Sequence, residues 1–545
     1  MKKTKKPAKR TAAKKSPAKT RSARARRPAT GRQSGKNRRS PEQMLAELKR
    51  RLLEMSDLGA AGAVLSWDEA TYMPPGGAVA RGRQGATLQR LVHEQILDPA
   101  FGRLLDGLES YADRLPPDAD DACLLRVTRR NYEKAIKVPA DYVTRAAQHG
   151  SATYNAWIKA RPANDFASMI PYLEKTVDQS REYAGFFRPY KHIADPMIDD
   201  AEEGMTTASV RALFSELRGE LVPIVKSICE QPVADDSCLR GPFGEAEQLA
   251  FGLKVATQLG YDLNRGRLDK THHPFCTRFA AGDVRITTRV RDNDLGDALF
   301  STVHEAGHAM YEQGVSASFD GTPLGSGVSA GVHESQSRLW ENVIARSRGF
   351  WEHYYPQLQG VFADQFRNVS LDTFYRAINK VERSLIRTDA DEVTYNLHVM
   401  LRFDLETDLL EGRLKVKDLP EAWNARMQAD LGVTPPDDRD GCLQDVHWYG
   451  GGIGGAFQSY TIGNILSAQF FGAAVNAHPG IPREIAAGSF GTLHRWLTDN
   501  IYRHGHKYTP AETVRRATGE PLTMAPYLAY LREKYGALYD LPAAA

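Results

Sequence analysis

Cysteine is scarce in this chain of 545 residues: there are five, and no two of them have CxxC spacing. An odd number without that spacing argues against a disulfide framework and fits a reducing compartment. No apolar run approaches the roughly 18–20 residues that cross a bilayer. The basic N-terminus also lacks the apolar segment that follows the charges in a signal peptide. These absences predict a cytoplasmic protein without a membrane span.

Acidic residues are absent from positions 1–40, which hold 17 lysines and arginines. Subtracting that charge from the net +4 of the whole chain leaves −13 for the other 505 residues. Because residues 1–39 hold almost nothing apolar, they cannot bury enough surface to offset chain entropy, and we expect a disordered basic tail. Such a tail can bind nucleic acid or another polyanion non-specifically, or it is a solvated extension without a partner.

Strand patterns are sparse, and the best is residues 283–290, which alternate and are rich in β-branched side chains. Helical spacing of apolar residues fills most of the remaining chain. Clear examples are residues 207–229, 243–260, 370–386 and 392–411. Order should begin near Ser40, which offers an N-cap before a proline and a capping-box glutamine. We therefore predict a tail over residues 1–39 and one large, mostly helical domain over residues 40–545, with a small central sheet.

Residues 294–313 predict an amphipathic helix that contains the sequence HEAGH. Asp294 can cap its start, and Gly314 can end it in a left-handed conformation. His304 and His308 are four residues apart on one helical face, so both imidazoles can reach a single metal ion. Glu305 projects from the adjoining side, where it can contact water on that metal. The HExxH pattern alone also fits a helix with two ordinary histidines and an exposed glutamate.

A catalytic zinc needs a third protein ligand and one open position. Glu334 lies 26 residues after His308 and can return on a second helix packed beside the first. Glu341, one heptad later, is a rival ligand or an outer partner that orients a liganding histidine. The residues alone favour Glu334 only modestly, because both glutamates also fit a solvated or salt-bridged helix face.

Seven short segments, taken in order, match the motifs of one known family. They are residues 67–74, 273–275 (HPF), 283–287 (DxRxT), 304–308 (HExxH), 333–336 (HESQ), 386–391 (IRxxAD) and 441–448 (GxxQDxHW). This series resembles the carboxypeptidase Taq family of metallopeptidases, and the resemblance runs from about residue 43 to 540. It implies an all-α fold with a small β-sheet near the active site, a neurolysin-like body of two lobes with a deep central groove, and a homodimer.

The resemblance also implies a zinc metallocarboxypeptidase that releases single C-terminal amino acids from peptides with broad specificity. Cobalt (Co²⁺) supports activity in some members of the family. The glutamate of HESQ is the family's third metal ligand, which carries onto Glu334. Glu305 would act as general base, taking a proton from a metal-bound water as that water attacks the scissile carbonyl.

A carboxypeptidase also needs a cation for the terminal carboxylate, and the planar fork of arginine suits that task. Arg387 is the first candidate by its place in the IRxxAD motif, although it can instead pair internally with Asp389 or Asp391. Arg285 is a weaker candidate, with pairing to Asp283 inside the sheet as the alternative.

An oxyanion donor is expected near the metal, and His447 and Tyr460 are candidates by their place in and after GxxQDxHW. Residues 455–464 read GAFQSYTIGN, where the family commonly reads GYFPTYTLGN, so Tyr449 is an alternative to Tyr460. The preceding glycine-rich run, residues 450–455, predicts either a mobile loop or tight turns. His273 is a candidate for lining the substrate site, or a structural histidine before a rigid turn.

Overall fold

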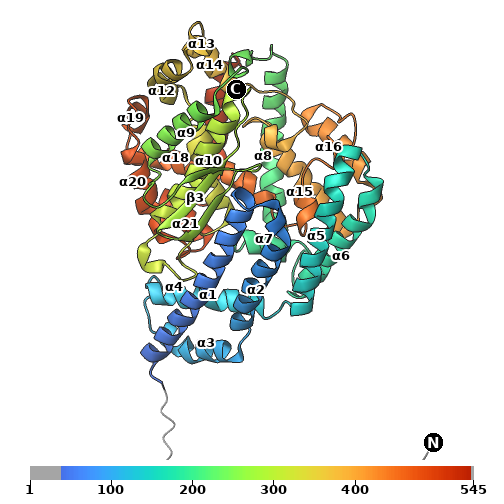
Figure 1. The fold of residues 1–545 in the computed structure, drawn as a ribbon, viewed down its shortest axis with the longest axis vertical. Coiled ribbons are helices and arrows are strands. Elements are labelled where there is room, and N and C mark those ends of the chain that lie inside the picture. The colour runs from blue at the N-terminus through green and yellow to red at the C-terminus, as the bar shows by residue number, and fades with distance from the viewer. Residues whose placement is uncertain (1–38, 542–545) are drawn as a thin grey trace, which may run out of the picture. The chain divides into compact units, whose positions relative to one another are not determined.

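The computed structural model describes residues 39–541, most of which are helical (Figure 1). The predicted basic tail lies outside the described residues, apart from Arg39. The helices are α1 (Pro41–Thr71), α2 (Ala78–Ile96), α3 (Pro99–Ala112), α4 (Asp120–Ala135), α5 (Ala140–Ala163), α6 (Ile170–Gly185), α7 (Asp195–Ala201), α8 (Thr207–Cys229), α9 (Glu245–Leu259), α10 (Leu295–Gly314), α11 (Ala330–Arg338), α12 (Arg348–Val361), α13 (Ala363–Phe366), α14 (Leu371–Ile378), α15 (Tyr395–Glu411), α16 (Leu419–Leu431), α17 (His447–Gly450), α18 (Gln458–Ala477), α19 (Ile481–Ala486), α20 (Gly491–Asn500), α21 (Pro510–Thr518) and α22 (Ala525–Leu538). None of these helices is both long and apolar enough to cross a bilayer.

The predicted helical fold with a small sheet is confirmed, and several helices match their predicted ranges closely. α1 begins at Pro41, α8 covers residues 207–229, and α9 and α15 lie inside their predicted ranges. Thr206 caps α8: its hydroxyl accepts the backbone N–H of Ser209 (3.2 Å), and the Ser209 hydroxyl accepts that of Thr206 (3.0 Å). Apolar spacing and capping residues therefore act together in setting these helix ends.

Two helix ends differ from the prediction. The helix predicted over residues 370–386 ends at Ile378, because Asn379 leaves the helical backbone and its side-chain amide donates to the carbonyls of Tyr375 and Arg346. Gly314 does not end α10 in a left-handed conformation, since Val315 follows with extended backbone and Gly314 has no positive φ. A Cβ at Gly314 would lie 2.7 Å from Cβ of Tyr502, so glycine is needed there for close packing.

The small sheet has the strand order β1 (Leu268–Lys270), β3 (Asp283–Thr288), β2 (Cys276–Ala280). β1 runs parallel to β3 with Leu268 opposite Ile286, and β2 runs antiparallel with Cys276 opposite the same residue. The buried side of β3 faces α10, where the Thr288 hydroxyl donates to the carbonyl of Ala298 (3.1 Å). The sheet thereby supports the helix that carries HEAGH.

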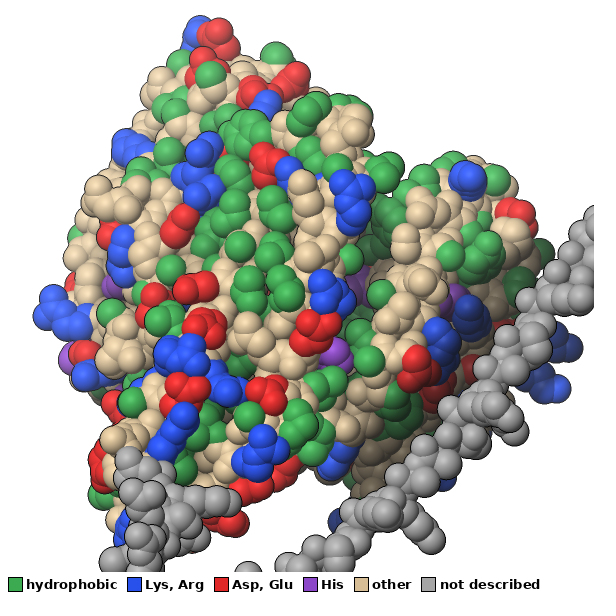
Figure 2. All heavy atoms as spheres, turned by 60° about the horizontal axis from the view of Figure 1, so that its bottom comes forward, with side chains coloured by type: hydrophobic (Ala, Val, Ile, Leu, Met, Phe, Trp, Pro, Cys, Tyr) green, Lys and Arg blue, Asp and Glu red, His purple; other side chains and the backbone are tan. Residues whose placement is uncertain are grey.

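The described body has two hydrophobic cores. The first gathers side chains from α9, α10, α12 and β3, including Val303, and the second gathers side chains from α6, α8, α15 and α16, including Leu401. Figure 1 shows the two groups of helices on opposite sides of the ribbon. α18 contributes Leu466 to the first core and Ile465 to the second, so it joins the two halves. Figure 2 shows this body hollowed between two masses, with histidine side chains visible in the hollow.

Candidate metal centre

The two histidines of HEAGH lie on α10, and Glu334 faces them from α11. The Nε2 atoms of His304 and His308 lie 3.8 and 3.4 Å from Oε2 of Glu334. One ligand atom from each residue lies within 4.8 Å of the other two. A cation about 2.0–2.2 Å from each donor bridges such distances. The structure thus brings together the three predicted ligands from two helices.

Two glycines let the helices around these ligands approach closely. A Cβ at Gly307, inside HEAGH on α10, would lie 2.6 Å from the carbonyl oxygen of Gln336 on α11. A Cβ at Gly463 on α18 would lie 2.6 Å from Cβ of Glu334. The absence of a side chain at each position therefore sets the distance from α10 and α18 to the helix that carries Glu334.

Glu341 lies at the outer edge of His304, away from the cluster of donor atoms. Its Oε2 is 2.8 Å from Nδ1 of His304, so that nitrogen can carry the proton and leave Nε2 for a cation. Glu341 belongs to a π-helical turn, Leu339–Ile344, a geometry often found at functional sites. The geometry favours Glu334 as the ligand and Glu341 as the outer partner.

Arg338, to which sequence reasoning gave no role, orients both glutamates. Its Nε lies 2.6 Å from Oε1 of Glu334, and its Nη1 lies 3.3 Å from Oε2 of Glu341. Because Arg338 occupies Oε1, the other oxygen of Glu334 faces the histidines. The position of Arg338 four residues after Glu334 on one helix is the signal that could have indicated this pair.

His308 is oriented by a chain of two further side chains. Its Nδ1 lies 2.5 Å from Nδ1 of His333, and Nε2 of His333 lies 2.8 Å from Oε1 of the buried Glu312. If His308 donates to His333 and His333 donates to Glu312, every N–H in the chain has an acceptor. That tautomer leaves Nε2 of His308 unprotonated for a cation.

Burial and neighbouring charges shift the pKa values of the site groups in different directions. Burial would lower the pKa of His304, but the charges of Glu334 and Glu341 and the hydrogen bond to Glu341 raise it. Burial would raise the pKa of Glu334, but the charges of Arg338 and the two histidines hold it well below its usual range. Burial lowers the pKa of His308 to about 4, so its ring is neutral at pH 7. Burial also raises the pKa of Glu305 to about 7, with Glu334 and Glu341 adding to the rise and His304 opposing it. An anionic ligand thus lies beside a neutral imidazole and a carboxyl group that can exchange a proton near neutral pH.

Glu341→Gln is expected to weaken metal binding by about 10- to 100-fold, because the amide cannot replace the carboxylate that orients His304. Competition with a coloured chelator measures the dissociation constant. Glu352→Gln, on the exposed face of α12 and paired with Arg348, is the matched control and should bind metal normally. Unchanged affinity in Glu341→Gln would contradict an orienting role for Glu341.

A second group of polar side chains comes from the segments around α15, α17 and α18. Nε of the buried Arg387 lies 2.6 Å from Oδ2 of Asp445, and its Nη1 donates to the hydroxyl of Tyr395 (2.9 Å). Oδ1 of Asp445 lies 2.5 Å from Nδ1 of His447, whose Nε2 lies 3.1 Å from the Tyr460 hydroxyl. The internal partner of Arg387 is therefore Asp445, which sequence reasoning did not assign, rather than Asp389 or Asp391.

Tyr395 joins this group to the metal centre. Its ring lies under Arg338, whose guanidinium carbon is 4.5 Å from the ring centroid, and its hydroxyl accepts from Arg387. Burial raises the pKa of Tyr460, and the negative charge of Glu334 adds to that rise. The predicted ligands and the residues His447 and Tyr460 thus belong to one continuous site.

The remaining predicted residues are placed differently. Arg285 forms two short contacts with Asp283 (2.8 and 2.7 Å) and stacks on Trp67, which matches the internal pairing considered for it. Tyr449 is fully buried and donates to the carbonyl of Cys442, so it does not replace Tyr460. His273 follows β1 with an exposed side chain, and the charges of His447 and Arg387 add to the effect of partial burial in lowering its pKa. A role of His273 in lining the substrate site stays a prediction.

The glycine-rich run forms close contacts and one unusual turn. Gly454 has φ +102°, and a Cβ at Gly455 would lie 2.5 Å from the carbonyl oxygen of Met197. The backbone N–H of Ile453 donates to the Ser180 hydroxyl (3.0 Å). Of the two predictions for this run, the structure favours tight turns.

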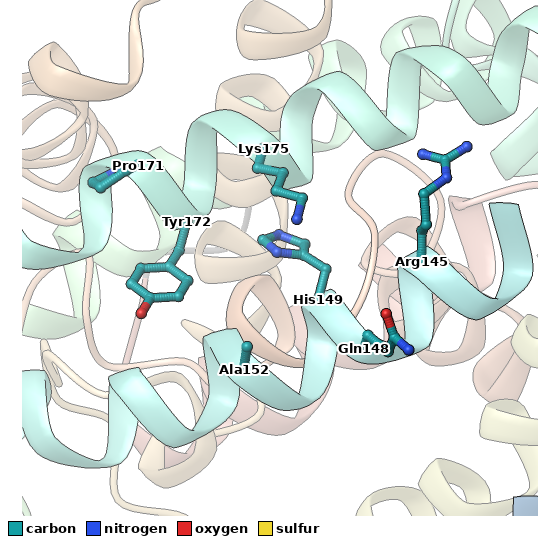
Figure 3. A pocket seen from close by; sticks show the side chains of 7 residues that line it. All are labelled: Arg145, Gln148, His149, Ala152, Pro171, Tyr172 and Lys175. Atoms are coloured by element: carbon teal, nitrogen blue, oxygen red, sulfur yellow. The ribbon is translucent and has the colours of Figure 1, made fainter. Parts of the chain in front are cut away.

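A pocket of about 450 Å³ lies apart from the metal centre, between α5 and α6 (Figure 3). Its lining includes His149, Lys175 and Arg145, and His149 and Lys175 lie close together in the view. Burial and the charge of Lys175 lower the pKa of His149, whose Nε2 lies 3.0 Å from the Thr176 hydroxyl. His149 thus serves the packing of α5 on α6 and contributes nothing to the predicted ligand set.

Comparisons with known proteins agree with this geometry. The family model described as carboxypeptidase Taq (M32) metallopeptidase matches residues 47–535. Thermostable carboxypeptidase 1 of Thermus thermophilus is 41% identical over 509 residues, covering 91% of this chain and 98% of the relative. The crystal structure of an M32 carboxypeptidase from Deinococcus radiodurans superposes with a TM-score of 0.89 and 50% identity, covering 91% of this chain and all of that one. A Pyrococcus furiosus carboxypeptidase structure designated Apo-Mg has a TM-score of 0.86 and 34% identity, with 90% and 99% coverage.

Proposed function

The chain belongs to the carboxypeptidase Taq (M32) family of metallopeptidases, which hydrolyse peptides at the C-terminus with a divalent metal, and we propose that it does so with zinc and with Glu305 as general base. His304, His308 and Glu334 would hold the metal. The observation that carries this proposal is the convergence of three donor atoms within 4.8 Å beside a buried glutamate. We propose that single C-terminal residues are released, with broad side-chain tolerance.

The donor set supports zinc as the metal. Two imidazoles and one carboxylate, with one position left open, are typical of catalytic zinc in peptidases. Hard cations such as Mg²⁺ prefer oxygen ligands and octahedral geometry, which this set does not offer. Metal analysis of purified protein should give one zinc per chain, with Co²⁺ able to replace it. Stoichiometric magnesium without zinc would contradict the assignment.

The chain's own residues supply the proton transfers. When bound, the cation lowers the pKa of a water molecule and polarises the scissile carbonyl. Glu305 takes a proton from the attacking water and later passes it to the leaving amine. A pKa near neutrality suits a group that must both accept and return a proton. His447 and Tyr460 would donate hydrogen bonds to the developing oxyanion.

Arg387 is proposed to pair with the terminal carboxylate of the peptide. Its Nε contacts Asp445, while its Nη2 lies 3.5 Å from Nδ1 of His447, one of the proposed oxyanion donors. His273 would line the same subsite. A competing role is purely internal, in which Arg387 only anchors Asp445.

The carboxylate role predicts a strong preference for peptides with a free C-terminus. Arg387→Met should lower kcat/KM for the free acid by roughly 100-fold more than for the amidated peptide, because only the free acid loses its partner cation. Paired assays of the two peptides measure the ratio. Arg285→Met is the control and should keep the wild-type preference, because Arg285 pairs with Asp283. Equal losses on both peptides would contradict the role of Arg387, and equal wild-type rates on both would indicate an oligopeptidase.

Three further properties stay predictions: a homodimer, binding of a polyanion by residues 1–39, and a cytoplasmic location. Sedimentation of the full chain tests the first. Salt-dependent retention on DNA, compared between the full chain and a variant lacking residues 1–39, tests the second.

A further inference from the structure

Two buried side chains on α15, one basic and one acidic, contact the segment that carries His447. Arg402 is fully buried, and Glu406, one helical turn later, is 2% exposed. Nε of Arg402 contacts Oδ2 of Asp445 (3.0 Å), and its Nη2 donates to Oε1 of Gln444 (2.9 Å). Arg402 therefore holds the residues that precede His447.

Glu406 holds the residues that follow His447. Its Oε1 accepts the indole N–H of Trp448 (2.7 Å), and its Oε2 accepts the backbone N–H of Gly454 (3.1 Å). These two donors lie at opposite ends of the glycine-rich run, so one carboxylate ties both ends to α15. Burial raises the pKa of Glu406, while Trp448, Gly454 and Arg402 lower it. Trp448 and Gly454 can only donate, so both oxygens of Glu406 act as acceptors, as in an ionised carboxylate, and the two N–H partners offset part of the cost of burying it.

Trp448 and Gly454 are directly linked to the proposed oxyanion donors. Trp448 is the neighbour of His447 in sequence, and the segment after Gly454 leads into α18, on which Tyr460 lies. A shift of either N–H donor away from Glu406 would move the ring of His447 relative to the Tyr460 hydroxyl, 3.1 Å away. Within residues 39–541, the hydrogen-bond partners of the Glu406 carboxylate are Trp448 and Gly454, and neither is a predicted metal ligand.

We propose that Glu406 is a positioning residue for catalysis, which fixes the ring of His447 against the Tyr460 hydroxyl by closing the ends of the glycine-rich run. The inference rests on the proposed function of His447. It assigns to Glu406 an effect on turnover that acts through His447 and leaves the metal in place.

Glu406→Gln is the first test, because glutamine keeps the shape of the side chain but has only one acceptor oxygen. Its amide N–H₂ would face one of the two N–H donors. Because two donors cannot form a hydrogen bond, that hydrogen bond would be lost. We expect kcat to fall by about 10- to 100-fold, as for a small displacement of a catalytic group. Metal content and KM should stay close to wild type. A wild-type kcat would overturn the proposal.

The second test combines Glu406→Gln with His447→Ala. If Glu406 acts through His447, the double variant should have the kcat of His447→Ala alone. If the fold-loss in kcat of the double variant equals the product of the two single losses, the inference is overturned while the role of His447 stays intact. A wild-type kcat in His447→Ala alone would instead overturn the proposed oxyanion role, and this inference with it.

Two more variants keep the test decisive should Glu406→Gln fold poorly. Trp448→Phe keeps an aromatic ring against Trp423, removes the indole N–H and reduces the buried side-chain volume. It should lower kcat less than Glu406→Gln and add nothing to His447→Ala. Asp408→Asn, on the same helix and paired with Arg413, is the control and should keep wild-type kcat. Multiplying losses for Trp448→Phe and His447→Ala would also overturn the proposal.

Discussion

Replacing Glu305 with glutamine is expected to abolish peptide hydrolysis while each chain still binds one metal ion. Glutamine has nearly the same volume and keeps α10 intact, but it cannot accept a proton from the attacking water. General base catalysis by a positioned carboxylate contributes about 10²- to 10⁴-fold to a rate. The same residue would also return the proton to the leaving amine, so we expect a loss near the upper end of that range. The three predicted ligands are untouched, so metal content should not change.

The measurement is a comparison of kcat/KM and metal content for wild type and Glu305→Gln on one peptide. Glu352→Gln makes the same chemical change on the exposed face of α12 and should behave as wild type. Metal loss in Glu305→Gln would mean that Glu305 is a ligand. Full activity in the metal-loaded variant would remove Glu305 from the mechanism.

The ligand residues could be predicted from the sequence because they follow a local geometric rule. His304 and His308 share a face of any helix over residues 294–313, whatever surrounds it. The apolar spacing that predicts this helix also predicts α8 and α9. Glu334 is harder to predict as a ligand than the two histidines, since Glu341 falls on nearly the same helical face. The family motif, and not the spacing, distinguishes Glu334 from Glu341.

The partners of the ligands could not be predicted, because they depend on how distant segments meet. The chain from His308 through His333 to Glu312 requires α11 to cross α10 at Gly307, and no local pattern reports that crossing. The π-helical turn that carries Glu341 has no sequence signature in the patterns used for ordinary helices.

The helix predicted over residues 370–386 is too long, and the reason is again a contact between distant segments. Apolar spacing continues past Ile378, but the side-chain amide of Asn379 donates to the carbonyl of Tyr375 in the last turn of α14 and to that of Arg346, and the helix ends. The non-helical stretch that follows is what allows Arg387 to reach Asp445. Tertiary contacts therefore outweigh helical spacing at the part of the chain that forms the second group of site residues.

Glu334→Gln is expected to lose both metal and activity. The amide oxygen is a weaker, uncharged ligand, so affinity should fall by more than the roughly 10- to 100-fold expected for an outer partner such as Glu341. Activity should follow metal occupancy and return in part with excess zinc. Chelated wild type should recover fully on adding zinc. Equilibrium dialysis with metal analysis, beside peptide hydrolysis at several zinc concentrations, measures both effects.

The variant also leaves Arg338 without its closest partner in a buried site, which costs about 3–5 kcal/mol where a buried ion pair is broken. Glu334→Gln with Arg338→Met removes both charges and should recover most of that stability without recovering metal. This separates a lost ligand from a damaged fold. Should Glu334→Gln keep its metal while Glu341→Gln loses it, Glu341 is the third ligand, and the contact of its Oε2 with Nδ1 of His304 must rearrange when the cation binds.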